Sequence, residues 1–217
     1  ENIFDVQFKH SGKWGEEGSL QHSDWGPRNT SGSTTAFGGW GGFGPSQYLY
    51  DSYDAKDKRK TAFFWTEFAG IPQTPPSIKK FWDPKHGNEI ENDDLNFIYI
   101  RYADVLLMRA EALNATDDKT NAKYDCLNEV RRRAGLDDIT AADNLTKQQF
   151  ADILLEERLH ELCCEHMRRF DLIRFGKLAE QMKAAYDITI RDFHVLYPIP
   201  QSAMDANDAI TENNPGY

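Results

Sequence analysis

Hydrophobic and polar positions follow different periods in the two halves of the chain. Residues 3–8 alternate apolar and polar side chains, which predicts one β-strand. From Ile98 onward apolar residues recur every three or four positions, which predicts a helix with one apolar stripe. A second helix is predicted over residues 121–134, with Gly135 as its C-terminal stop. Two antiparallel helices joined by a brief turn resemble one tetratricopeptide unit.

The third predicted helix has the clearest start signal. Thr146 and Gln149 form a capping box, and the helix is predicted to continue to about Gly176. Three of its carboxylates stand four residues apart and share one helix face: Glu157, Glu161 and Glu165. Such a row serves either as an acid–base or metal site or as one side of an ion-pair network. The density of nearby arginines favours the network, with these candidate partners: Arg158, Arg168 and Arg169.

The first half is rich in loops and aromatic residues. All five tryptophans precede residue 83, and ten of the fifteen glycines lie within residues 12–44. Because disordered linkers lack large aromatic residues, this composition favours an ordered, functional loop. After it we predict a short helix over 45–53 and a strand over 61–68, and we place Trp65 and Trp82 in the core. Four prolines then predict an irregular chain up to about residue 95: Pro72, Pro75, Pro76 and Pro84.

Charge and length exclude several classes of protein. The 217 residues contain 25 Lys and Arg against 35 Asp and Glu, a net charge of −10. This balance argues against nucleic-acid binding, which depends on basic side chains that neutralise phosphates. The sequence has no apolar run of the roughly 18 residues that a membrane-spanning helix needs. The chain starts with neither a signal peptide nor a start methionine, so we expect further residues upstream.

Metal and nucleophile motifs are incomplete. In the segment His160–His166, Cys164 stands where a zinc protease motif requires its second histidine. The three cysteines form neither a disulfide framework nor a CxxC pair: Cys126, Cys163 and Cys164. The sequence also has no GxSxG, Walker or strand-linked GxGxxG motif. We therefore predict no catalytic residues, no bound metal and no cofactor.

Four segments together carry a resemblance to the SusD/RagB family. Their order and spacing match that family, and jointly they are highly specific. The segments are Ile100–Asn114 (IRYADVLLMRAEALN), Leu127–Leu136 (LNEVRRRAGL), Glu157–Leu162 with Arg169–Gly176 (ERLHEL and RFDLIRFG), and Leu196–Gln201 with Asn213–Tyr217 (LYPIPQ and NNPGY). One departure is His166-Met167, where the family commonly has Gly-His or Gly-Gln.

The resemblance implies a mainly α-helical, SusD-like fold with long irregular loops and a few short strands. In this interpretation residues 1–97 form a loop- and aromatic-rich ligand-binding region, and residues 98–217 form the helical C-terminal region of one continuous domain. The chain would be the C-terminal half of the full protein. The resemblance also implies a non-catalytic, lipid-anchored protein of the bacterial outer-membrane surface. Such a protein binds glycan oligomers and delivers them to a SusC-like, TonB-dependent transporter.

The glycine-rich loop offers the candidate ligand-binding residues. Sugar rings present patches of C–H groups that stack on the flat faces of Trp and Tyr, while Asp, Asn and Arg hydrogen-bond the hydroxyl groups. The candidates are Trp14, Trp25, Trp40, Asp24, Arg28 and Asn29. The alternative role for any one of these tryptophans is packing the loop against the helices.

Three other functions remain open from the sequence. A member of the same family that binds peptides would keep the fold and change the ligand. A helical protein–protein interaction module would use the aromatic loop as its interface. A glycosidase would use two of the many carboxylates, although no motif places such a pair.

The cysteine pattern gives a first testable prediction. Elemental analysis of the purified protein should detect no stoichiometric zinc, because zinc sites need about four ligands and the sequence completes no such set. One zinc per chain would contradict the prediction.

Overall fold

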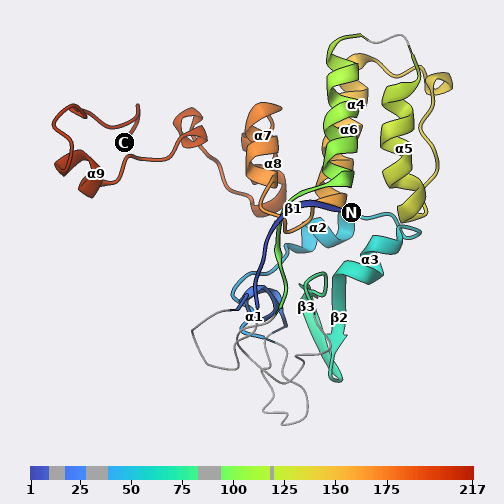
Figure 1. Cartoon of the computed structure of the whole chain (residues 1–217), viewed down its shortest axis with the longest axis horizontal. Coiled ribbons are helices and arrows are strands. Elements are labelled where there is room, and N and C mark those ends of the chain that lie inside the picture. Colours follow the sequence, from blue (N-terminus) through green and yellow to red (C-terminus); the bar gives the residue numbers. More distant parts are fainter. Residues whose placement is uncertain (10–17, 28–38, 83–93, 118–119) are drawn as a thin grey trace. The chain divides into compact units, whose positions relative to one another are not determined.

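The computed structural model describes residues 1–9, 18–27, 39–82, 94–117 and 120–217, which form two compact units, 1–168 and 169–217. The first unit contains β1 (Asn2–Val6), α1 (Gln21–Trp25), α2 (Gln47–Ser52), α3 (Lys58–Phe63), β2 (Phe64–Phe68), β3 (Ile71–Ile78), β4 (Phe97–Arg101), α4 (Tyr102–Ala115), α5 (Ala122–Ala134), the 3-10 helix Ala141–Asp143 and α6 (Lys147–Glu161) (Figure 1). The second unit contains α7 (Arg168–Arg174, whose first residue belongs to the first unit), α8 (Leu178–Tyr186), the 3-10 helix Asp192–Val195 and α9 (Gln201–Asp205). Helices therefore dominate, as the sequence predicted.

Three helices of the first unit enclose its main core. α4 packs against both α5 and α6, as Figure 1 shows. Their contact is made by fully buried side chains: Leu107, Ala110, Leu127, Phe150 and Leu154. The capping box predicted at the start of α6 is present, since Thr146 and Gln149 bond reciprocally. Gly135 ends α5 with a φ of 83°, a left-handed conformation that glycine adopts without steric cost.

Strands occupy two places where the sequence predicted other structure. The helix expected from Ile98 is preceded by β4, which pairs antiparallel with β1, so α4 begins only at Tyr102. Three of the four prolines expected to keep the chain irregular, Pro72, Pro75 and Pro76, lie in β3, which pairs antiparallel with β2, and Pro84 lies outside the described residues. Between Trp65↔Ser77 and Glu67↔Pro72 the pairing shifts register, so residues 73–76 bulge from the ladder. A bulge tolerates proline, which has no N–H to donate.

The single long helix predicted to reach Gly176 is interrupted. α6 ends at Glu161, and α7 starts at Arg168. Within the interruption Cys164 and His166 have φ values of 63° and 65°. A continuous α-helix requires negative φ throughout, so these two residues turn the chain.

The carboxylate row forms a buried ion-pair network, with partners that the sequence analysis did not identify. Glu157 lies 2.6 Å from Arg59 and 3.1 Å from Arg131. The remaining pairs are Glu161 with Arg101 (2.6 Å), with Arg59 (3.1 Å) and with Arg133, and Glu165 with Arg101 (2.8 Å) and with Lys80. These partners come from α3, β4, α5 and the segment after β3. The sequence had instead indicated candidate partners from the same helical segment.

The predicted arginine partners have other roles. Arg158 pairs with Asp104 of α4 at 2.7 Å, and both side chains are buried. Arg168 donates to the backbone carbonyl of Leu155 at 3.0 Å. Arg169 donates to the carbonyl of His194 at 2.9 Å, within the second unit. All three side chains therefore bind parts of the scaffold.

Burial and charge act in opposite directions on these acids. Burial by itself raises the pKa of Glu161, but Arg101 and Arg133 outweigh it and lower the pKa to about 2. At Glu157 burial is the larger effect and raises the pKa in spite of Arg59 and Arg131. Burial, followed by the charge of Arg59, lowers the pKa of His160 to about 4.

The second unit depends on the C-terminal motif. Asn213 accepts from the Ile199 N–H at 2.8 Å and donates to the Ile199 carbonyl at 3.1 Å. Gly216 has a φ of 97°, and a Cβ there would lie 2.4 Å from the Phe193 ring. The Phe193 and Tyr217 rings meet edge to face with centroids 5.0 Å apart. These contacts give residues of the final Asn-Asn-Pro-Gly-Tyr segment defined partners within the second unit.

In the described part of the chain no helix is long and apolar enough to cross a membrane.

Replacing Glu161 with alanine should lower the free energy of unfolding by about 3–5 kcal/mol, because it leaves three arginines without a common buried partner. Urea unfolding measures this change. Glu156→Ala on the exposed side of α6 is the control and should change stability by no more than about 0.5 kcal/mol. We also expect Glu161→Ala to have a larger effect on Tm than on the affinity for any ligand. Unchanged stability combined with abolished binding would contradict a structural role.

Histidine 160 should make stability fall in acid. Its side chain is buried with a pKa of about 4, whereas an unfolded histidine takes up a proton near pH 6.5. The unfolded chain therefore gains a proton first, and about 3 kcal/mol of stability is lost between pH 6.5 and 4. Urea unfolding across this range should give a flatter pH dependence for His160→Gln than for wild type. Parallel curves would contradict the assignment.

Candidate functional site

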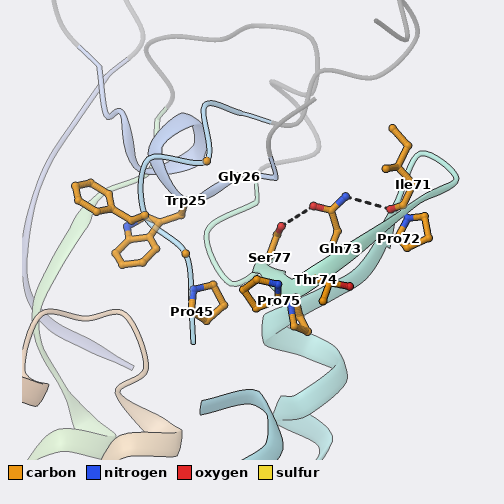
Figure 2. A pocket seen from close by; sticks show the side chains of 13 residues that line it. Trp25, Gly26, Pro45, Ile71, Pro72, Gln73, Thr74, Pro75 and Ser77 are labelled. Atoms are coloured by element: carbon orange, nitrogen blue, oxygen red, sulfur yellow. Dashed lines mark hydrogen bonds between the residues drawn. The ribbon is translucent and has the colours of Figure 1, made fainter. Parts of the chain in front are cut away.

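A hollow of about 380 Å³ lies between the segment around α1 and strand β3. Figure 2 shows Trp25 on one side and Gln73, Thr74 and Ser77 on the other. The full lining is Trp25, Gly26, Gly41, Phe43, Gly44, Pro45, Ile71, Pro72, Gln73, Thr74, Pro75, Pro76 and Ser77. Hollows of this size suit small organic ligands or a short length of a polymer.

The two walls of the hollow have separate local causes. On one side, the N–H groups of Gly41 and Phe43 bond the carbonyls of Gly26 and Asp24 at 3.1 and 3.0 Å. These two bonds hold the glycine-rich segment beside the end of α1. On the other side, the bulge at 73–76 pushes β3 out of its ladder with β2. The proline residues that were expected to prevent a strand therefore form a wall of the site.

Aromatic rings give the hollow its apolar surface. The half-buried Trp25 lies 5.2 Å from Phe43, 6.1 Å from Phe81 and 6.1 Å from His166, measured between ring centroids. Phe43 is 54% exposed, and Trp40, next to the lining residue Gly41, is 39% exposed. The Trp25 ring thus packs against other rings and also forms part of the surface of the hollow. The rings of Phe43 and Trp40 are exposed to solvent.

The amide of Gln73 is one of the polar groups that line the hollow. Its Oε1 accepts from the Ser77 hydroxyl at 2.8 Å, and its Nε2 donates to the Ile71 carbonyl at 3.1 Å (Figure 2). A carbonyl accepts but never donates, so the amide nitrogen must face Ile71, which fixes the orientation of the side chain. An amide has two N–H donors and two acceptor lone pairs. One donor and one acceptor therefore remain for a ligand.

The structure locates three of the six predicted ligand-binding residues. Trp25 lines the hollow, and Trp40 is exposed beside it. Asp24 contributes its backbone carbonyl, which holds Phe43 in place. Trp14, Arg28 and Asn29 lie outside the described residues. Sequence reasoning missed Phe43, Gln73 and Ser77, although Phe43 stands among the same glycines and carried a usable signal.

Trp65 and Trp82 belong to a separate aromatic cluster. Their ring centroids lie 6.2 Å apart, and both rings pack edge to face on Phe68. Lys79 lies over the Trp65 ring at 4.5 Å. Both tryptophans are half-buried rather than fully enclosed, so they stabilise the β2–β3 hairpin more than a deep core.

A second hollow of about 370 Å³ is strongly polar. It contains Ser52 and His160, whose Oγ and Nε2 lie 3.0 Å apart, the distance of a nucleophile–base pair. The Ser52 hydroxyl, however, donates to the Leu49 carbonyl at 2.7 Å. Histidine must therefore donate to the serine oxygen rather than take its proton, and the pair stabilises structure.

Thiols and carboxylates form no evident metal centre in the described residues. No group of three His, Cys, Asp or Glu side chains in that part of the chain is arranged to hold a metal ion. Cys126 is buried, and burial raises the pKa of its thiol. The Cys163 and Cys164 sulfurs lie 3.4 Å apart, and the hydrogen bond from Cys164 lowers the pKa of Cys163.

Comparison with known proteins identifies the family of the matched residues. Residues 69–217 match the model of the SusD family. SusD-like protein P2 of Formosa agariphila is 29% identical over 82% of this chain and 41% of its own length. The chain thus spans about two fifths of that relative.

Solved structures share the fold. A SusD superfamily protein from Parabacteroides distasonis superposes with a TM-score of 0.79 at 24% identity, over 100% of this chain and 50% of its own. A structure described as a laminarin-binding SusD-like protein superposes with a TM-score of 0.76 at 26% identity, over 100% of this chain and 50% of its own.

Proposed function

The chain belongs to the SusD family, and from this premise we propose that it binds glycan oligomers at the bacterial cell surface without catalysing their breakdown. The protein then passes the glycan to a SusC-like, TonB-dependent transporter in the outer membrane. A lipid anchor attaches the protein to that membrane. The ligand-binding surface is the hollow between α1 and β3 together with Trp40.

The observation that carries this proposal is the pairing of aromatic rings with an oriented amide in one hollow. Trp25 and Phe43 supply apolar ring surface, on which the C–H face of a sugar stacks. Gln73 supplies a donor and an acceptor at the opposite wall, which suits neighbouring sugar hydroxyls. The laminarin-binding neighbour supports the same class of ligand.

The non-catalytic part of the proposal is supported by the state of the acids. Glycosidases place two carboxylates on either side of the scissile bond. The described lining of the hollow contains no carboxylate. Glu157 and Glu161 are buried and paired with arginines in the scaffold, and neither residue belongs to the described lining of that hollow.

We further propose a division of labour along the chain. Residues 1–97 provide the ligand-binding region, and residues 98–217 provide the helical scaffold. Trp14, Arg28 and Asn29 remain proposed ligand contacts, together with Trp25, Trp40 and Asp24. The support is that the whole described lining lies within residues 25–77.

Calorimetric titration of the full-length protein with a panel of glycan oligomers tests the function. Trp40→Ala should weaken binding by about 1–3 kcal/mol and leave Tm nearly unchanged, because the Trp40 ring is exposed. Trp25→Ala should weaken binding and also lower Tm, because Trp25 packs on three other rings. Trp14→Ala completes the series.

Tyr99→Ala is the matched control, since Tyr99 is a 63% exposed aromatic on β4 outside the lining. It should bind glycan like wild type. If all three tryptophan variants bind glycan like wild type, the ligand-binding site does not include these tryptophans. Binding of peptides but no glycan would support the peptide-binding alternative, and release of reducing sugar would support the glycosidase.

A further inference from the structure

Every side chain in the described lining of the hollow is uncharged. The thirteen residues comprise glycine, proline, isoleucine, two aromatic residues, and the polar residues Gln73, Thr74 and Ser77. Resting on the proposed function, we infer that the ligand is an uncharged glycan and that Gln73 is the residue that selects it over glycans carrying carboxylate or sulfate groups.

The geometry of Gln73 suits a neutral hydroxyl. Its two intramolecular bonds, to Ser77 and Ile71, fix the amide before a ligand arrives. The remaining N–H can donate to the oxygen of one hydroxyl group, and the remaining lone pair can accept from another hydroxyl group. An amide therefore satisfies two neighbouring hydroxyls, whereas an anion offers only acceptors and leaves the free lone pair of Gln73 facing negative charge.

The cations nearest in sequence to this wall already have partners. Lys80 pairs with Glu165 and donates to the carbonyl of Glu161 at 3.0 Å. Lys79 lies over the Trp65 ring and donates to the Thr61 carbonyl at 3.5 Å. A carboxylate in the hollow would lose hydration without gaining either charge as a partner, which is unfavourable. The net charge of −10 adds a general repulsion of polyanions.

Matched glycans test the inference directly. Full-length protein is titrated with neutral oligosaccharides, among them laminarihexaose, and with the carboxymethylated derivative of each, at low and at physiological ionic strength. The neutral form should bind, and the derivative should bind at least about tenfold more weakly, a difference worth one decade in Kd. At physiological ionic strength, salt screens the repulsion between the net charge of the protein and the derivative. The difference in Kd between the neutral and the carboxymethylated glycan should therefore become smaller by the contribution of that repulsion.

Variants locate the selection. Gln73→Glu replaces the free donor with negative charge and should weaken neutral glycan binding by about tenfold or more. Ser77→Ala keeps the amide but removes one of its two orienting bonds, so a smaller loss is expected. Gln148→Glu adds the same charge on the exposed surface of α6, outside the lining, and should bind like wild type. The Tm of each variant is measured as well, because a variant that loses binding at an unchanged Tm has lost a ligand contact and not its fold.

The outcomes distinguish the inference from the function on which it rests. Equal or tighter binding of carboxymethylated or sulfated glycans would overturn the inference and leave glycan binding intact. Gln73→Glu that folds and binds like wild type would overturn the role of Gln73. If no glycan of either class binds, the proposed function and the inference fail together.

Discussion

The row of carboxylates on α6 and just beyond it is the constraint on which the first unit depends. Glu157 and Glu161 are buried, the side chain of Glu165 is 8% exposed, and an uncompensated buried carboxylate is strongly unfavourable. Each must therefore be reached by a guanidinium or ammonium group from another element. Arg59 reaches from α3, Arg101 from the end of β4, and further arginines from α5. The need to neutralise this row brings together parts of the chain that are as much as 102 residues apart.

The same network positions the candidate site. Arg59 lies in α3, which leads directly into β2, and Lys80 is the second residue after β3. Both ends of the β2–β3 hairpin are thus fixed to the carboxylate row by ion pairs, and β3 forms one wall of the hollow. Phe81, the residue after Lys80, packs on Trp25 of the other wall. Scaffold and site are therefore joined by neighbouring residues, and Tm and binding must be measured together in any variant of this region.

Sequence periodicity was sufficient to predict the helices of the first unit, but it was insufficient to predict which elements contact one another. The capping box at Thr146, the stop at Gly135 and the apolar stripes are local signals, and the structure contains them. The break after Glu161 is not local, since the helical pattern continues through it while two residues take positive φ. A strand at 71–78 was not expected from its prolines, and two of them, Pro75 and Pro76, fall where the pairing with β2 shifts register. The ion partners of Glu157 were invisible because pairing across distant segments leaves no period in the sequence.

Candidate ligand-binding residues show the same limit. Tryptophans among glycines are a compositional signal, and Trp25 and Trp40 carried it. Gln73 carried none, since a glutamine between prolines becomes a binding group only when Ser77 and Ile71 orient its amide. The ion pairs of Glu157 and Glu161 are buried, and the described lining of the hollow contains no charged side chain. That separation has a physical basis: ion pairs hold the scaffold rigid, and a rigid neutral surface gains affinity for hydroxyl-rich rings through stacking and a few oriented hydrogen bonds.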